Sequence, residues 1–113
     1  MGNKKYRVVI ANSGKLDVKA KKRYILEQFK YREYAENYSQ NIKKAAKELG
    51  IYPRKHEMTG FRYRGYDIYI KPQDNQLLFY TINEEKHIVT VLRVLQDGMD
   101  WQNIIKRWLS KHS

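Results

Sequence analysis

The sequence predicts an α+β domain of two layers with the order β-α-α-β-β-β-α, in which two N-terminal helices pack on an antiparallel-rich sheet. Apolar residues recur with helical spacing up to about residue 50 and with strand-like spacing after it. A length of 113 residues suits one domain. No repeat or Pro/Gly/Ser-rich linker divides the chain, so we expect a single domain over residues 1–113.

The first half of the chain predicts one strand and two helices. Residues 6–10 are rich in β-branched side chains and predict a strand, and residues 12–14 offer a turn with helix-capping oxygens. Two helical stripes of apolar residues follow, and their phases differ by about two residues, which predicts a break near residues 31–34. Gly50 is expected to stop the second helix. The stripes are Val18, Ile25 and Phe29, then Tyr38, Ile42, Ala45 and Leu49.

The second half predicts three strands and a terminal helix. A strand over residues 61–71 is expected to continue past Gly65 with a kink or bulge, and residues 72–75 form a turn. Two further strands are expected at 77–82 and 87–95. The last is apolar on both faces apart from Thr90 and Arg93, which predicts a central strand covered on both sides. Asp100 is expected to cap a helix with Trp101, Ile104, Ile105, Trp108 and Leu109 on one side.

The charge favours a polyanionic or acidic partner. The chain has 23 Lys and Arg residues against 12 Asp and Glu, a formal charge of +11. It has no cysteine, which excludes disulfides, thiolate zinc sites and cysteine nucleophiles. It has no apolar run of 18 residues, and Met1–Tyr6 lacks the apolar stretch of a signal peptide. We therefore expect a cytoplasmic protein that does not bind membranes.

Familiar catalytic motifs are missing. The three histidines, His56, His87 and His112, are far apart and have no metal-binding spacing, so no metal is expected. Gly60 and Gly65 have the spacing of a phosphate loop but lack its Lys-Ser/Thr. There is no nucleophile elbow, and no small-molecule cofactor is expected.

A group of arginines in the sheet half offers the remaining chemistry. Arg62 and Arg64 are two residues apart and would share one face of a strand, while Arg93 interrupts an apolar strand. Together they could form an anion-binding cleft, because a guanidinium donates to phosphate through a planar fork. The alternative for Arg93 is an internal salt bridge, for example with Asp67, Glu57 or Asp100. The sequence leaves both open.

Residues 77–101 resemble the C-terminal signature of the RelE/ParE toxin superfamily. The run Leu78-Phe79-Tyr80, a polar hairpin, the segment from Ile88 to Gln96 and then Met99-Asp100-Trp101 are similar to the family's "IFY" strand followed by "ILRVLHGRRD". The order of strand, two helices and antiparallel strands also matches. The resemblance implies a basic toxin of a prokaryotic type II toxin–antitoxin pair, with roles such as plasmid stabilization, neutralised by an acidic, partly disordered antitoxin.

The resemblance implies two branches of activity. RelE-like members cut mRNA on the ribosome without a metal, for which Arg62, Arg64 and Arg93 would hold the phosphate and Tyr66 or Tyr69 would orient or stack. ParE-like members poison DNA gyrase through a protein-binding surface. Gln96 stands where the family commonly has a histidine, and glutamine is no general acid or base, so the ParE-like branch is slightly favoured.

Two further sets of residues complete the prediction. The residues expected to bind nucleic acid or the target are Lys19, Lys21, Lys22, Lys71 and Gln96. Those expected to bind a partner are Trp101, Ile104, Ile105 and Trp108, which should pack against the sheet or a partner. A third interpretation, a basic nucleic-acid-binding module without toxicity, explains the charge but not the motif in residues 77–101.

Overall fold

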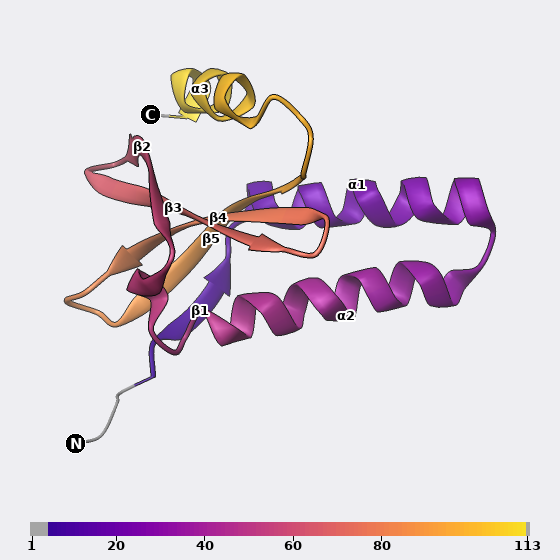
Figure 1. Ribbon diagram of the computed structural model, residues 1–113, viewed down its shortest axis with the longest axis horizontal. Coiled ribbons are helices and arrows are strands. Elements are labelled where there is room, and N and C mark those ends of the chain that lie inside the picture. Colours follow the sequence, from indigo (N-terminus) through magenta and orange to yellow (C-terminus); the bar gives the residue numbers. More distant parts are fainter. Residues whose placement is uncertain (1–4, 113) are drawn as a thin grey trace.

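A computed structural model describes residues 5–112 and contains one mixed sheet with three α-helices (Figure 1). The expected α+β class is confirmed. The helices are α1 (Asn12–Phe29), α2 (Arg32–Glu48) and α3 (Trp101–His112), with a short 3-10 turn, η1 (Pro53–Lys55). The strands are β1 (Arg7–Ile10), β2 (Glu57–Tyr63), β3 (Tyr66–Gln73), β4 (Gln76–Asn83) and β5 (Ile88–Gln96).

The sheet has the order β1-β5-β4-β3-β2, with β1 parallel to β5 and the other neighbours antiparallel. Four strands follow the helices, one more than expected, because Arg64 and Gly65 form a turn between β2 and β3. Their φ angles of 52° and 87° suit the tight turn of a two-residue hairpin. Pro72 lies inside β3, and the next turn is confined to Asp74 and Asn75.

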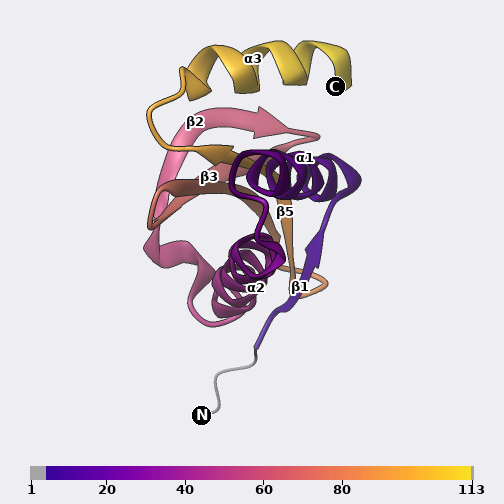
Figure 2. The ribbon, with the colours of Figure 1, turned by 90° about the vertical axis from the view of Figure 1, so that its right-hand side faces the viewer.

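Two hydrophobic cores lie on opposite faces of the sheet (Figure 2). The helical hairpin covers one face, where Ile42 and Ala45 of α2 and the following Leu49 share a core with residues of β4 and β5. These are Leu78, Tyr80 and Ile82 of β4 and Val89, Val91 and Val94 of β5. Helix α3 covers the other face through Ile105 and Trp108 and adds a layer there. The prediction of a central strand covered on both sides is confirmed for β5.

The helical hairpin projects beyond the sheet, and its two helices run side by side in both ribbon views (Figures 1 and 2). The expected break between the helices falls at Lys30 and Tyr31, slightly earlier than predicted. Lys30 has a left-handed φ of 59°, and its N–H donates to the carbonyl of Leu26. This αL cap ends α1 and turns the chain back into α2.

Candidate functional site

One face of α1 lies along the edge of β5 beyond the end of β1. The carbonyl of Val91 accepts the Ala11 N–H, after which α1 side chains take over: Ser13 Oγ donates to the Leu92 carbonyl at 2.6 Å, and Asp17 Oδ2 accepts the Val94 N–H at 2.9 Å. Ser13 and Asp17 are four residues apart and therefore lie on the same face of α1. Ser13 thus lies inside α1 and binds β5 instead of capping the helix.

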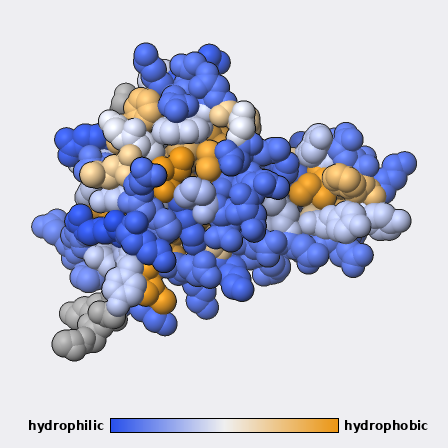
Figure 3. Space-filling view, in the orientation of Figure 1, coloured by the Kyte–Doolittle hydropathy of each residue, from blue (hydrophilic) through white to orange (hydrophobic). Residues whose placement is uncertain are grey.

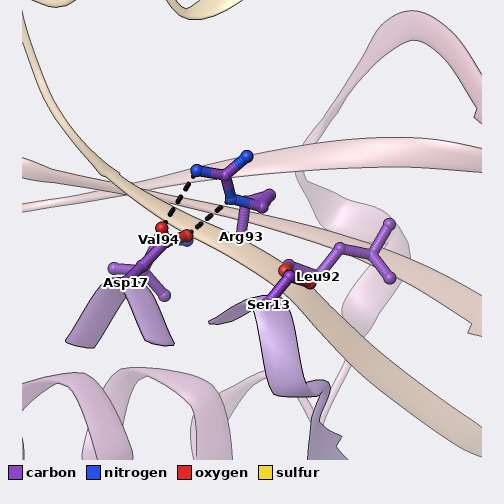
Figure 4. Close-up of polar contacts among 5 residues, drawn as sticks. All are labelled: Ser13, Asp17, Leu92, Arg93 and Val94. Atoms are coloured by element: carbon purple, nitrogen blue, oxygen red, sulfur yellow. Dashed lines mark hydrogen bonds and ion pairs between the residues drawn. The ribbon is translucent and has the colours of Figure 1, made fainter. Parts of the chain in front are cut away.

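Arg93 is held by this seam (Figure 4). Asp17 accepts its Nε at 2.7 Å and its Nη2 at 2.9 Å, a bidentate ion pair whose side chains are 17% and 16% exposed. The alternative of an internal salt bridge is therefore the one observed, but its acid is Asp17 and not one of the three acids suggested. The guanidinium also lies 5.9 Å from the ring centroid of Trp108, on the α3 face.

Arg62 and Arg64 do not join Arg93 in one cleft. Phe61 and Tyr63 pack on the α3 face, so Arg62 between them points to the opposite face from Arg93. Three strand spacings also separate β2 from β5, about 14 Å. Arg62 pairs with Asp67 at 3.4 Å, and Arg64 lies in the turn with its guanidinium 5.0 Å from the Tyr63 ring. The expectation that Arg62 and Arg64 share one face of a strand was wrong, because the chain turns at Arg64.

Tyr66 and Tyr69 line a polar pocket of about 300 Å³. Asn83 Nδ2 donates to the Tyr66 hydroxyl at 3.1 Å. Tyr69 is only 7% exposed, and its ring stacks on Tyr80 with centroids 5.4 Å apart, so it belongs mainly to the core.

The cation of this pocket is already paired. Arg54 donates to Glu84, which also accepts the Tyr6 hydroxyl. The hydrogen bond from Tyr6 lowers the pKa of Glu84, and the same bond raises the pKa of Tyr6. Nearby, burial and the charge of Lys71 lower the pKa of His56. The pocket therefore offers little unpaired positive charge to a phosphate.

Lys71 is unavailable to a target. Its side chain is buried, and Nζ donates at 3.1 Å to both the Ala45 carbonyl and the Glu48 carboxylate. This hydrogen bond lowers the pKa of Glu48. Lys71 therefore ties α2 to β3, which corrects its assignment to a binding surface.

The other predicted target-binding residues lie on or beside α1. Lys21 Nζ donates to Gln96 Oε1 at 2.8 Å and extends the seam by one more turn. Lys19 is exposed, and Lys22 pairs with Glu36 of α2 at 3.4 Å. Lys19 and Lys22 line a groove that sequence reasoning missed.

This hairpin groove is formed by α1, α2 and β1. It consists of two adjoining cavities of about 540 and 530 Å³, which share Ile10 and Lys43. The first has apolar lining residues Ile10, Val18, Leu26 and Ile42, and cations Lys15, Lys19, Lys22, Arg23 and Lys43. The second continues toward Gly50 with Lys5, Lys44 and Lys47. The signal in the sequence was Leu26, an apolar residue that lies beside the first helical stripe and is 40% exposed.

Aromatic residues extend this apolar surface to the end of the hairpin. Phe29, Tyr31 and Tyr34 are 53%, 60% and 49% exposed, and the rings of Phe29 and Tyr31 each contact that of Tyr34 edge to face. Figure 3 shows hydrophobic colour gathered near this end of the hairpin, between hydrophilic surroundings. Exposed apolar surface therefore continues from the hairpin groove to the end of the helical hairpin.

The predicted partner-binding residues of α3 are directed to the sheet. Ile105 and Trp108 are 1% and 8% exposed, and Trp101 contacts Phe79 with ring centroids 5.3 Å apart. Ile104 is partly buried against the same core. This face packs on the chain's own sheet, which is one of the two surfaces expected for it, so these side chains belong to the core and are not an open surface for a partner. Asp100 accepts hydrogen bonds from the backbone and side chain of Asn103, as expected of a cap.

Residues 5–112 contain neither a metal-binding cluster nor a membrane-spanning helix. No group of three or more His, Asp or Glu side chains is placed to hold a metal ion in this part of the chain. No helix in the same range is long and apolar enough to cross a membrane.

The fold, a strand and helical hairpin packed on an antiparallel meander, is similar to that of chains from solved ParDE and RelBE2 systems. Residues 8–101 match the family model described as "ParE toxin of type II toxin-antitoxin system, parDE". The chain belongs to this family and is the toxin component of a type II toxin–antitoxin system.

Solved structures support the same fold. A chain of the chromosomal ParDE system from P. aeruginosa matches with a TM-score of 0.65 at 11% identity, over 85% of this chain and 100% of that one. The toxin–antitoxin complex RelBE2 from Mycobacterium tuberculosis contains a chain with a TM-score of 0.56 at 17% identity, over 84% and 94%. No curated protein matches the sequence. At these identities the structural matches establish the fold and not the target.

Proposed function

We propose that this protein is a single toxin domain that acts in the cytoplasm by ParE-like inhibition of DNA gyrase. The observation that carries the proposal is that three arginines are paired with carboxylates and do not converge on one site. Arg62, Arg93 and Arg54 each pair with a carboxylate, and Arg62 and Arg93 point to opposite faces of the sheet. A nuclease that works without a metal needs donors converging on the charge that develops on a phosphate. This arrangement supplies no such convergence, which favours action through protein binding.

The same proposal includes an acidic antitoxin that docks in the hairpin groove. The groove combines apolar walls with a rim of cations, and one of its two sets of lining residues contains no carboxylate. An acidic amphipathic segment would bury its apolar side chains there and pair its carboxylates with the lysines. Such a segment would also reduce the repulsion within a chain of charge +11.

The proposal is tested with purified toxin in two parallel reactions. We expect inhibition of gyrase supercoiling, or gyrase-dependent double-strand breaks, with intact mRNA on translating ribosomes. Adding the neighbouring gene product, if it is a small acidic protein, should restore supercoiling. Cleaved mRNA with unaffected gyrase would contradict the proposal.

RelE-like mRNA cleavage is the second candidate. The position of Tyr66 favours it, because its hydroxyl lies at a polar pocket beside the Arg62–Asp67 pair. Tyr66→Phe and Arg62→Gln test it, since both side chains are exposed and their removal should leave the fold intact. For a nuclease we expect mRNA cleavage to fall by about a hundredfold or more. For a gyrase inhibitor, both variants should retain toxicity, as should the control Arg107→Gln on the outer face of α3.

A further inference from the structure

The first cavity of the hairpin groove has the size and lining of a small-molecule site. Its volume of about 540 Å³ falls within the range of about 300–1,000 Å³ that is usual for ligand pockets. Four aliphatic residues of β1, α1 and α2 line it, and Ser39 adds a hydroxyl. Five cations and no carboxylate complete the lining.

These cations lie close to one another around an apolar surface. Lys15, Lys19 and Lys22 come from successive turns of α1, and Lys43 stands across from them on α2. Of the cations lining this cavity, Lys22 has a carboxylate partner, Glu36, while no ion pair is found for Lys15 or Lys19 within the described residues. An anion would relieve the mutual repulsion of the rim, and an apolar body attached to it would cover the aliphatic residues.

We propose that this cavity binds small amphipathic anions, molecules with one aliphatic or aromatic body and one carboxylate or phosphate. Both halves of the ligand are needed, because an apolar body alone leaves the cations unpaired and an inorganic anion alone leaves the aliphatic lining in water. An acidic antitoxin segment carries the same chemistry. The ligand therefore competes with the antitoxin for the groove, a consequence that rests on the proposed function.

The chemistry is tested by titrating methyl-labelled protein with three probes that share a ten-carbon chain, each kept below the concentration at which it forms micelles or separates from solution. Decanoate should bind with one-to-one stoichiometry and shift the NMR signals of the methyl groups of Ile10, Val18, Leu26 and Ile42. Decanol should bind about tenfold more weakly, and decyltrimethylammonium should leave these signals unchanged. Equal binding of all three probes, or binding that leaves the methyl signals of these four residues unchanged, would overturn the proposal.

A matched pair of variants separates the site from general attraction to a basic protein. Lys15→Glu with Lys19→Glu should weaken decanoate binding by about tenfold or more, since each reversal replaces attraction by repulsion at the rim. Lys106→Glu with Arg107→Glu changes the net charge equally on the exposed face of α3 and should change binding by less than about twofold. Equal losses in both double variants would refute a specific site.

Competition tests the consequence for regulation. Saturating decanoate should lower the affinity of the toxin for its antitoxin, while decyltrimethylammonium should not. If decanoate binds the groove but the antitoxin complex is unaffected, the ligand site is supported and the antitoxin does not bind in the hairpin groove. If the antitoxin binds the groove but decanoate does not, the ligand site is wrong and the proposed function stands.

Discussion

Replacing Asp17 by Asn should lower the free energy of unfolding much more than the same change at an exposed acid such as Asp67. Asp17 accepts three hydrogen bonds, two from Arg93 and one from the Val94 N–H, at 2.7–2.9 Å. Asparagine has one acceptor oxygen in place of two and turns an amide N–H₂ toward the guanidinium. Hydrogen bonds to charged groups contribute about 1.5–3 kcal/mol, and a half-buried arginine left without its acid adds to this loss. We expect the free energy of unfolding to fall by about 2–3 kcal/mol, or Tm by roughly 10 °C.

The assay is equilibrium urea unfolding followed by circular dichroism, with Asp67→Asn as the matched control. Asp67 forms the exposed pair with Arg62, whose side chains are 51% and 65% exposed, so its loss should cost less than about 1 kcal/mol. Both variants change the net charge equally. If Asp17→Asn costs no more than Asp67→Asn, the seam between α1 and β5 does not stabilise the fold as argued.

A second variant distinguishes a structural role of Arg93 from a catalytic one. Asp17→Leu combined with Arg93→Met replaces the pair by apolar side chains of similar size, which should recover much of the stability lost in Asp17→Asn. If the proposed function is right, toxicity should then persist, because Arg93 serves to hold α1 on β5 through Asp17. Loss of toxicity in a double variant that folds normally would show that the guanidinium itself is needed.

Two further predictions concern packing and pH. Gly14→Ala should lower the free energy of unfolding by about 1–3 kcal/mol in the same urea assay, because the added Cβ would lie 3.1 Å from Ile10 Cγ2 and 3.2 Å from the Val91 carbonyl oxygen; an unchanged midpoint would contradict this close approach. The free energy of unfolding should decrease in two windows as the pH is lowered. His56 and Glu84 have lower pKa values in the folded chain than in the unfolded chain, so the unfolded chain binds protons first. Burial lowers the pKa of His56, so its contribution is complete above its unfolded value of 6.5 and is lost as the pH falls through the lower folded value. The pKa of Glu84 is lowered by its hydrogen bond from Tyr6, which gives the same sign below 4.5. His56→Gln and Glu84→Gln should each flatten one window of the urea midpoint plotted against pH, and a profile unchanged in both variants would refute the assignment.

Features that depend on neighbours in the chain were readable from the sequence. The two helical stripes, the strand with two apolar faces and the cap at Asp100 each follow from a local period or a local hydrogen bond. The motif in residues 77–101 predicted the family, which the match over residues 8–101 confirms. Even so, the turn at Arg64 was missed, because a left-handed arginine has no reliable local signal apart from the glycine that follows it.

Only the tertiary structure decided what each charged residue does. Asp17 and Arg93 are 76 residues apart, and no period in the sequence brings them together. Lys71 looked like a surface cation, yet α2 covers it and supplies both of its acceptors. The sequence by itself determined most of the helices and strands, apart from the turn at Arg64, and how much positive charge the chain carries. Packing determined which of those charges are neutralised by a carboxylate and which remain around an open apolar groove, because that depends on distances between elements remote in the chain.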